Sequence, residues 1–166
     1  MPLDDATHWR DLVAALDLQP HPEGGYYREV FRSGLPVSFQ GAQRSAGTSI
    51  YYLLAEEACS AWHRIDADEI WSFHAGGPLA LHVLTPDGEL LTHRLGDPRV
   101  QPGACFQAVA PAGCWFAAEL ESPGSFTLVG CAVAPGFEFS GFQLAAESDL
   151  SEAIRRHGDW LRRLLK

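Results

Sequence analysis

His63 and Glu69, near the middle of the chain, have side chains that could transfer a proton. They stand six residues apart in the segment 58–76, ACSAWHRIDADEIWSFHAG. A neutral imidazole titrates near neutrality and can act as a base, and a carboxylate can fix its tautomer. Alternatively, burial beside Trp71 and Phe116 would raise the pKa of Glu69 and make it the acid. We take His63 and Glu69 as the candidate catalytic pair.

A tyrosine hydroxyl could complete such a site by protonating the opposite face of a substrate. Tyr51 and Tyr52 are the candidates, and strand parity lets only one of them point inward. Small-molecule pockets combine apolar and aromatic walls with a few polar groups. The other candidate substrate-binding residues are Trp71, Phe73, His82, Gln107 and Phe116. The aromatic members of this set could equally be core residues, and His63 with Glu69 could be a buried ion pair.

These side chains must be positioned by β-structure, because short apolar runs alternate with turn residues between positions 26 and 133. The predicted strands are 26–32, 49–54, 61–65, 69–73, 79–84, 90–94, 104–110, 115–120 and 126–133. Many short strands with turns between them predict a sandwich or barrel. Alternate side chains of a closed barrel face inward, so His63 and Glu69 can reach one cavity.

Helices are predicted at both ends of the chain. Residues 7–16 have apolar side chains at helical spacing, with Thr7 as a possible N-cap. Residues 148–165 form a second helix whose basic C-terminal half suits the helix dipole. The segment 19–25 between the first helix and the first long strand is a turn. Within it, Glu23 could either cap backbone donors or fold over the pocket.

Composition excludes several classes of function. The chain has 166 residues, which suits one domain, and its formal charge is −9 with a pI near 5.1. An acidic surface disfavours binding to nucleic acids and to anionic membranes. We see no signal peptide, no apolar run long enough to span a membrane, and no C-x-x-C pair among the four cysteines. The expected location is therefore the cytoplasm, with reduced thiols.

The spacing of three residues resembles the first motif of the cupin superfamily, H-x-H-x(3–4)-E-x(6)-G. His63, Glu69 and Gly76 match it, and Ile65 stands where the second histidine would be. Metal-binding cupins ligate through three histidines and one glutamate, so the resemblance implies that the ligand set is incomplete here. We expect no cofactor, with a divalent metal at His63 and Glu69 as the remaining alternative. His82 is the best candidate for a third ligand.

The second cupin motif, G-x(5–7)-P-x-G-x(2)-H, resembles residues 103–116, with Phe116 in the histidine position. Over residues 8–145 the chain also resembles one uncharacterised cupin branch. That resemblance rests on residues 20–29, 49–54, 63, 68–71, 111–115 and 133–137. It implies an all-β, single-domain cupin spanning 1–166, a double-stranded β-helix or jelly-roll barrel with its core at about 25–145. The barrel is similar to that of the dTDP-sugar 3,5-epimerases.

The resemblance implies a small-molecule ligand inside the barrel. We expect metal-independent isomerisation or epimerisation of a sugar-like or other polar metabolite, with His63 as the general base. A non-catalytic module that binds or senses a small molecule is the alternative. A homodimer is expected as well, because epimerase-like cupins are usually dimers and the edge of the strand at 25–32 needs a partner.

Overall fold

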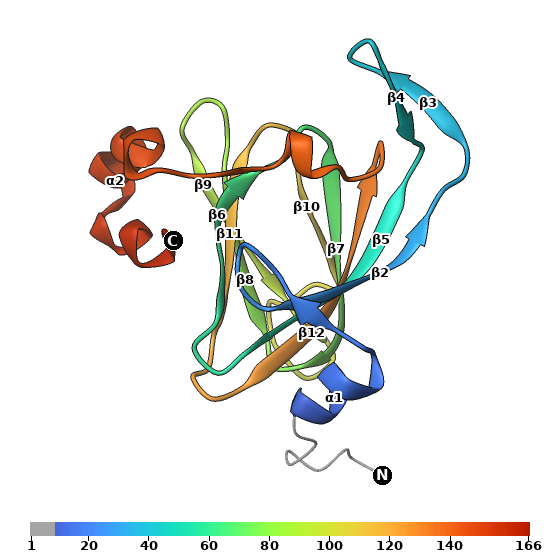
Figure 1. Ribbon diagram of the computed structural model, residues 1–166. Helices are drawn as coiled ribbons and strands as arrows, with labels where there is room; N and C mark the ends of the chain where they lie inside the picture. The colour runs from blue at the N-terminus through green and yellow to red at the C-terminus, as the bar shows by residue number, and fades with distance from the viewer. Residues whose placement is uncertain (1–8) are drawn as a thin grey trace.

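Two antiparallel β-sheets face each other in the computed structural model, which describes residues 9–166 (Figure 1). The strands are β1 (Gln19–Pro20), β2 (Tyr26–Arg32), β3 (Pro36–Phe39), β4 (Ala42–Ser45), β5 (Thr48–Ala55), β6 (Cys59–Arg64), β7 (Asp68–Gly76), β8 (Leu79–Leu84), β9 (Leu90–Leu95), β10 (Gln107–Ala110), β11 (Trp115–Leu120), β12 (Phe126–Ala134) and β13 (Gln143–Leu144). The helices are α1 (Trp9–Ala15) and α2 (Ser151–His157), and the 3-10 turns are η1 (Phe139–Gly141), η2 (Glu147–Leu150) and η3 (Asp159–Leu164). The predicted all-β barrel with short terminal helices is confirmed.

Strand order places the two candidate catalytic residues on opposite sheets. The first sheet has the order β1-β2-β5-β12-β7-β10, and the second has the order β13-β6-β11-β8-β9. Glu69 lies on β7 of the first sheet, where its neighbours are Ala110 and Val133. His63 lies on β6 of the second sheet, opposite Phe116. Side chains from both sheets can therefore enter a cavity that lies between them.

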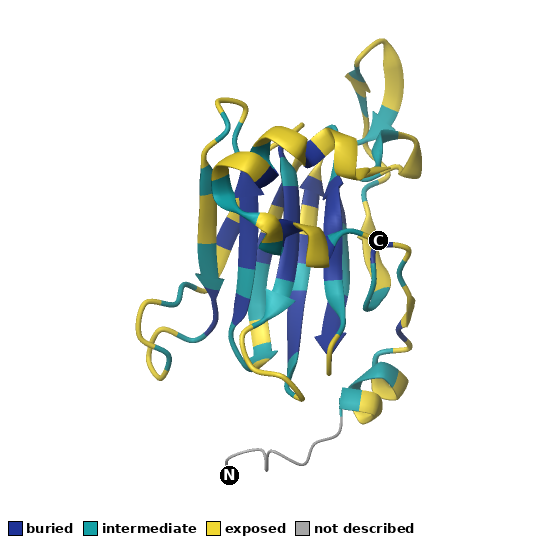
Figure 2. Cartoon of the chain, turned by 90° about the vertical axis from the view of Figure 1, so that its left-hand side faces the viewer, coloured by how far each residue is buried: buried dark blue, intermediate teal, exposed yellow. Residues whose placement is uncertain are grey.

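Alternation along the strands decides which side chains enter the barrel. On β7, Glu69 and Trp71 are buried, whereas Asp68 and Ile70 are exposed. The period of two is that of a strand with one face on the core. The core between the sheets is built in this way from apolar and aromatic side chains, and Figure 2 shows the buried segments along the strands.

The outer face of each sheet is partly covered by helical segments. Helix α1 packs on Leu53 and Leu128 of the first sheet. Helix α2 and η3 cover Trp62 and neighbouring residues of the second sheet. The prediction of one continuous helix over 148–165 is wrong, because Gly158 adopts φ +112° and separates α2 from η3. The predicted cap at Thr7 lies outside the described residues.

The hairpin of β3 and β4 was not predicted, and it projects from the barrel (Figure 1). Strand β1 pairs with Tyr26 and Tyr27 at the start of β2, and β5 pairs along the other side of β2. The homodimer expected from the edge of β2 stays a prediction. In the part of the chain that the structure describes, no helix is long and apolar enough to cross a membrane.

Candidate functional site

A cavity of about 140 Å³ opens between the two sheets at one end of the barrel. Strands β2, β5, β6, β7 and β12 supply its walls, and Ile65 after β6 and the segments 21–23 and 137–142 supply the rest. Its ionisable side chains are His21, Glu23, Tyr27, Glu29, Arg32, Tyr52, His63, Glu69, Cys131 and Glu138. Aromatic and aliphatic groups fill the spaces between them, as is usual in sites for small organic ligands.

His63 is held as one half of a buried ion pair. Its Nε2 atom lies 2.9 Å from Oε2 of Glu23, and its Nδ1 atom lies 2.6 Å from the carbonyl oxygen of Ala61. Both nitrogens therefore face oxygens that only accept hydrogen bonds, so the ring satisfies both contacts only when it is doubly protonated. Burial lowers the pKa of His63, but the charge and hydrogen bond of Glu23 outweigh this effect and the pKa is raised.

Glu23 is the anionic half of this pair, and it is 7 % exposed. Ser60 Oγ donates a hydrogen bond of 2.8 Å to its Oε1 atom. Burial raises the pKa of Glu23, but His63, His21 and Ser60 together lower it to about 2. His21 accepts a hydrogen bond at Nδ1 from the backbone N–H of Glu23, and burial lowers the pKa of His21. Neutral His21 thus lies beside a carboxylate that stays charged at neutral pH.

The turn before β2 brings Glu23 into the barrel. His21 and Gly25 pair through their backbones, and the carbonyl of Glu23 accepts from the N–H of Ala61 on β6. Gly24 has φ +112°, and a Cβ atom there would overlap the carbonyl oxygen of Cys59. Only glycine fits this approach of the turn to β6. Of the two alternatives for Glu23, the structure therefore favours the carboxylate that enters the pocket.

Glu69 is the buried carboxyl of the cavity that has no cationic partner. It is 8 % exposed, and within residues 9–166 no basic nitrogen lies in salt-bridge range of it. Burial raises its pKa to about 7, the negative charge of Glu23 adds to the rise, and His63 and the thiol of Cys131 oppose it. Of the two alternatives for Glu69, the one in which it orients His63 is wrong, because Glu23 is the carboxylate bonded to His63.

The parity of β5 turns Tyr52 inward and Tyr51 outward. Tyr52 lines the cavity, and its hydroxyl donates a 2.7 Å hydrogen bond to the carbonyl oxygen of Gly24. Burial raises the pKa of Tyr52 well above its usual value. Tyr51 packs in the cluster beneath α1 and lies 6.0 Å from His74, measured between ring centroids. Of the two tyrosines, only one of which strand parity allows to point inward, the inward one is therefore Tyr52.

Five of the other predicted binding residues lie away from the cavity lining. Trp71 and Phe116 are fully buried in the core, where they pack against Tyr52 and His63. Phe73 packs against the same core cluster. His82 faces the opposite side of its sheet, where it binds Thr92 and Glu119 and packs on Trp160. Gln107 is exposed and donates to Ser72. The expectation that these five line the pocket is corrected accordingly.

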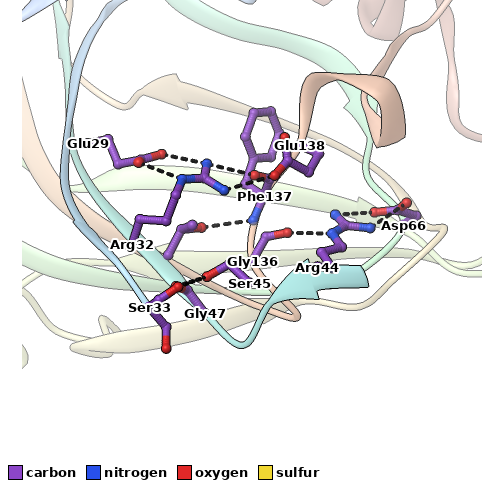
Figure 3. Close-up of polar contacts among 11 residues, drawn as sticks. Glu29, Arg32, Ser33, Arg44, Ser45, Gly47, Asp66, Gly136, Phe137 and Glu138 are labelled. Atoms are coloured by element: carbon purple, nitrogen blue, oxygen red, sulfur yellow. Dashed lines mark hydrogen bonds and ion pairs between the residues drawn. The ribbon is translucent and has the colours of Figure 1, made fainter. Parts of the chain in front are cut away.

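The mouth of the cavity is framed by residues that sequence reasoning did not select. Arg32 bonds to both carboxylate oxygens of Glu29, to Glu138 at 2.9 Å and to the carbonyl of Phe137 at 2.9 Å (Figure 3). These bonds hold the segment after β12 against β2. Phe137 belongs to a motif on which the family resemblance rests. The contact between β2 and this distant segment could not be predicted, because nothing in the sequence around either segment indicates it.

A second arginine anchors the same segment from the other side. Arg44 on β4 binds Asp66 through two bonds of 2.8 Å and bonds to the carbonyl of Gly136 (Figure 3). The hydrogen bonds of Arg44 lower the pKa of Asp66. Bidentate arginine–carboxylate pairs fix geometry as well as charge. Arg32 and Arg44 therefore hold residues 136–138, at the start of the segment that covers the cavity mouth, from two sides.

The donor set does not fit a metal ion. Both nitrogens of His63 are engaged with oxygens, and Phe116 stands opposite it on β11. A catalytic metal site generally needs three protein ligands with free lone pairs. Across residues 9–166, no group of three histidine, cysteine or carboxylate side chains is arranged to hold an ion. The candidate third ligand, His82, lies on the far face of its sheet.

Comparison with known proteins agrees with this fold. The family model described as Cupin superfamily (DUF985) matches residues 10–145. A hypothetical protein from Leishmania major is 34% identical with a TM-score of 0.85, covering 94% of this chain and 97% of that chain. A protein from Shewanella oneidensis is 38% identical with a TM-score of 0.82, covering 94% of this chain and 96% of that chain.

More distant likeness concerns the fold alone. Oxalate decarboxylase from Bacillus subtilis is 13% identical with a TM-score of 0.54, and the match covers 84% of this chain and 35% of that chain. No curated protein matches this chain. Because the family model covers most of the sequence and two solved structures exceed 30% identity over nearly its whole length, the protein belongs to the DUF985 family of the cupin superfamily.

Proposed function

We propose that the cavity binds a small polar organic molecule and that Glu69 moves a proton to or from it. The observation that carries this proposal is the difference between the two buried carboxyls. Glu23 is neutralised by His63, whereas Glu69 has no cation and its pKa is raised to about 7. A general acid or base is most effective when its pKa lies close to the working pH. Metal-independent isomerisation or epimerisation is the reaction class that this group supports.

The proposal moves the proton-transfer role away from His63. A general base needs a free lone pair, and each nitrogen of His63 points at an oxygen of Glu23 or Ala61. Its function in the proposal is to neutralise and position Glu23. The adjacent positive charge also makes it easier for Glu69 to lose its proton.

Tyr52 shapes the same wall. Its hydroxyl is committed to the carbonyl of Gly24, and its pKa is raised. A tyrosine that keeps its proton can donate a hydrogen bond but does not act as a base. We therefore assign Tyr52 to holding the turn that carries Glu23, with Glu69 as the titrating group next to the ligand.

Proton exchange with solvent provides the test. The protein is incubated in D₂O with a panel of small hydroxyaldehydes, hydroxyketones and amino sugars, and ¹H NMR follows loss of the C–H signal next to the carbonyl. The wild-type protein is expected to exchange at least one compound, and Glu69→Gln should slow that exchange by roughly 10²-fold or more. The rate should rise with pH through about 7, where Glu69 becomes the ionised base.

Glu152→Gln is the matched control, because it makes the same side-chain replacement at a position that is exposed on α2. It should keep the wild-type rate. Exchange by Glu69→Gln at the wild-type rate would contradict the role of Glu69. Compounds that bind to the wild-type protein without any exchange would contradict catalysis and would leave a binding or sensing module, the alternative function expected for this fold.

A further inference from the structure

The charges on the cavity lining are unbalanced toward the negative. Four carboxyl groups, Glu23, Glu29, Glu69 and Glu138, line it against two cations, Arg32 and His63. The excess is therefore two negative charges when Glu69 is ionised and one when Glu69 is protonated. His21, whose pKa burial lowers, adds no positive charge near neutral pH.

Neither cation is free to receive an anionic ligand. The guanidinium of Arg32 is bonded to Glu29, Glu138 and the carbonyl of Phe137. His63 is bonded to Glu23 and a backbone carbonyl. A carboxylate or phosphate entering the cavity would have to displace one of these partners while lying close to the other carboxylates. The lining therefore disfavours anions.

Aromatic rings cluster at the mouth beside these carboxylates. The rings of Phe137, Phe139 and Phe142 stand 4.9 to 6.3 Å apart between centroids, at interplanar angles of 73° to 82°. All three line the cavity, and Phe139 is 50 % exposed. Ring faces carry negative potential, so rings that line a cavity together with carboxylates can bind an organic ammonium group.

We infer that the ligand of this cavity carries an organic ammonium group, which lies against Phe137, Phe139 and Phe142 and is balanced by the surplus carboxylates. The inference rests on the proposed function and names the chemical class of its substrate: an amine-bearing polar metabolite. An engineered cavity of roughly 150 Å³ in another protein admits benzene. The cavity here, about 140 Å³, is close to that size and is large enough for a trimethylammonium group, which is smaller than benzene.

Binding of such a cation should be coupled to the proton on Glu69. The charged or titratable groups around Glu69 are Glu23, His63 and Cys131 close by, with His21, Tyr27, Glu29, Arg32, Tyr52 and Glu138 on the same lining. A bound cation stabilises the ionised form of Glu69, so the ligand should bind more tightly as the pH rises and should release a proton when it binds below about pH 7.

Choline and its uncharged isostere, 3,3-dimethyl-1-butanol, separate charge from shape. Titration calorimetry and ¹H–¹⁵N NMR shifts should show choline binding roughly 10-fold or more tightly than the alcohol. Repeating the choline titration across neutral pH in buffers of different ionisation enthalpy should show proton release. Glu69→Gln should remove the pH dependence of choline binding, and the alcohol should show none with either protein.

Phe139→Leu should weaken choline binding by roughly 5- to 30-fold while keeping an apolar side chain at the mouth. Phe106→Leu is its matched control, because Phe106 is another exposed phenylalanine and lies off the lining. Equal binding of choline and the alcohol, or no choline binding at millimolar concentration, would overturn the inference. Neither result changes the outcome of the proton-exchange test of Glu69. Conversely, proton exchange by Glu69→Gln at the wild-type rate would refute the proposed function but would not contradict an ammonium-binding site.

Discussion

Replacing Glu69 with glutamine should stabilise the protein in neutral and alkaline solution. In the unfolded chain the carboxyl has its ordinary pKa of 4.5, and in the folded protein the pKa is raised to about 7. Between these values the unfolded state loses the proton while the folded state keeps it. The free energy of unfolding therefore falls as the pH rises across this window and is constant, for this group, below and above it.

The size of the effect follows from the shift. One pKa unit corresponds to about 1.4 kcal/mol, so the wild-type protein loses about 3 kcal/mol of stability between about pH 4 and about pH 8 through Glu69 alone. Glutamine does not titrate and avoids this loss. For a chain of this length, about 3 kcal/mol corresponds to a rise in Tm of roughly 6 to 12 °C at the alkaline end.

Urea unfolding followed by tryptophan fluorescence measures the effect. The quantity of interest is the stability of Glu69→Gln minus that of the wild type, compared between the acidic and the alkaline condition. This double difference removes any fixed cost of the buried amide, which is present at both pH values. His63 keeps Glu23 as its counter-ion in both proteins. Glu152→Gln on the exposed face of α2 should give a flat difference. A flat difference for Glu69→Gln would refute the reasoning.

Further predictions concern the support of the site. His63→Gln should cost about 3 kcal/mol or more, because Glu23 stays buried without a counter-ion, and urea unfolding at neutral pH measures this loss. Tyr52→Phe should cost about 1 to 3 kcal/mol through the bond to Gly24, seen as a lower Tm. Gly24→Ala should shift the turn away from Cys59 and weaken choline binding, measured by calorimetry. Light scattering at micromolar concentration should show a homodimer, and a monomer would contradict that expectation.

The inward position of Glu69 could be predicted from the sequence, but the partner of His63 could not. Apolar and polar residues alternate from Trp71 to His74, and the strand period of two, extended back from Trp71, places Glu69 on the same inward face. Glu23 lies far before His63 in the chain, in a turn whose path depends on the positive φ of Gly24 and Gly25. A sequence pattern identifies such a turn but does not show which strand it packs against.

Errors in the predicted site have a similar origin. Strand β8, which carries His82, is buried along nearly all of its length because one face meets the core and the other meets η3. Without alternation, the pattern gives no orientation for the histidine. Gln107 was placed in a strand expected to begin at residue 104, but β10 begins at Gln107, which faces outward.

Glu23 lies in a turn outside the barrel strands. A substitution that removes its charge would therefore leave the strands of a related protein unchanged. A relative with a neutral residue there could keep every strand pairing, because only side-chain bonds join Glu23 to His63 and Ser60. Its histidine would no longer need both protons and would offer a free lone pair to a substrate or an ion. One substitution in this turn would thus change a histidine with both nitrogens bonded into one that can act as a base or ligand, so members of this family could acquire new chemistry while the barrel stayed the same.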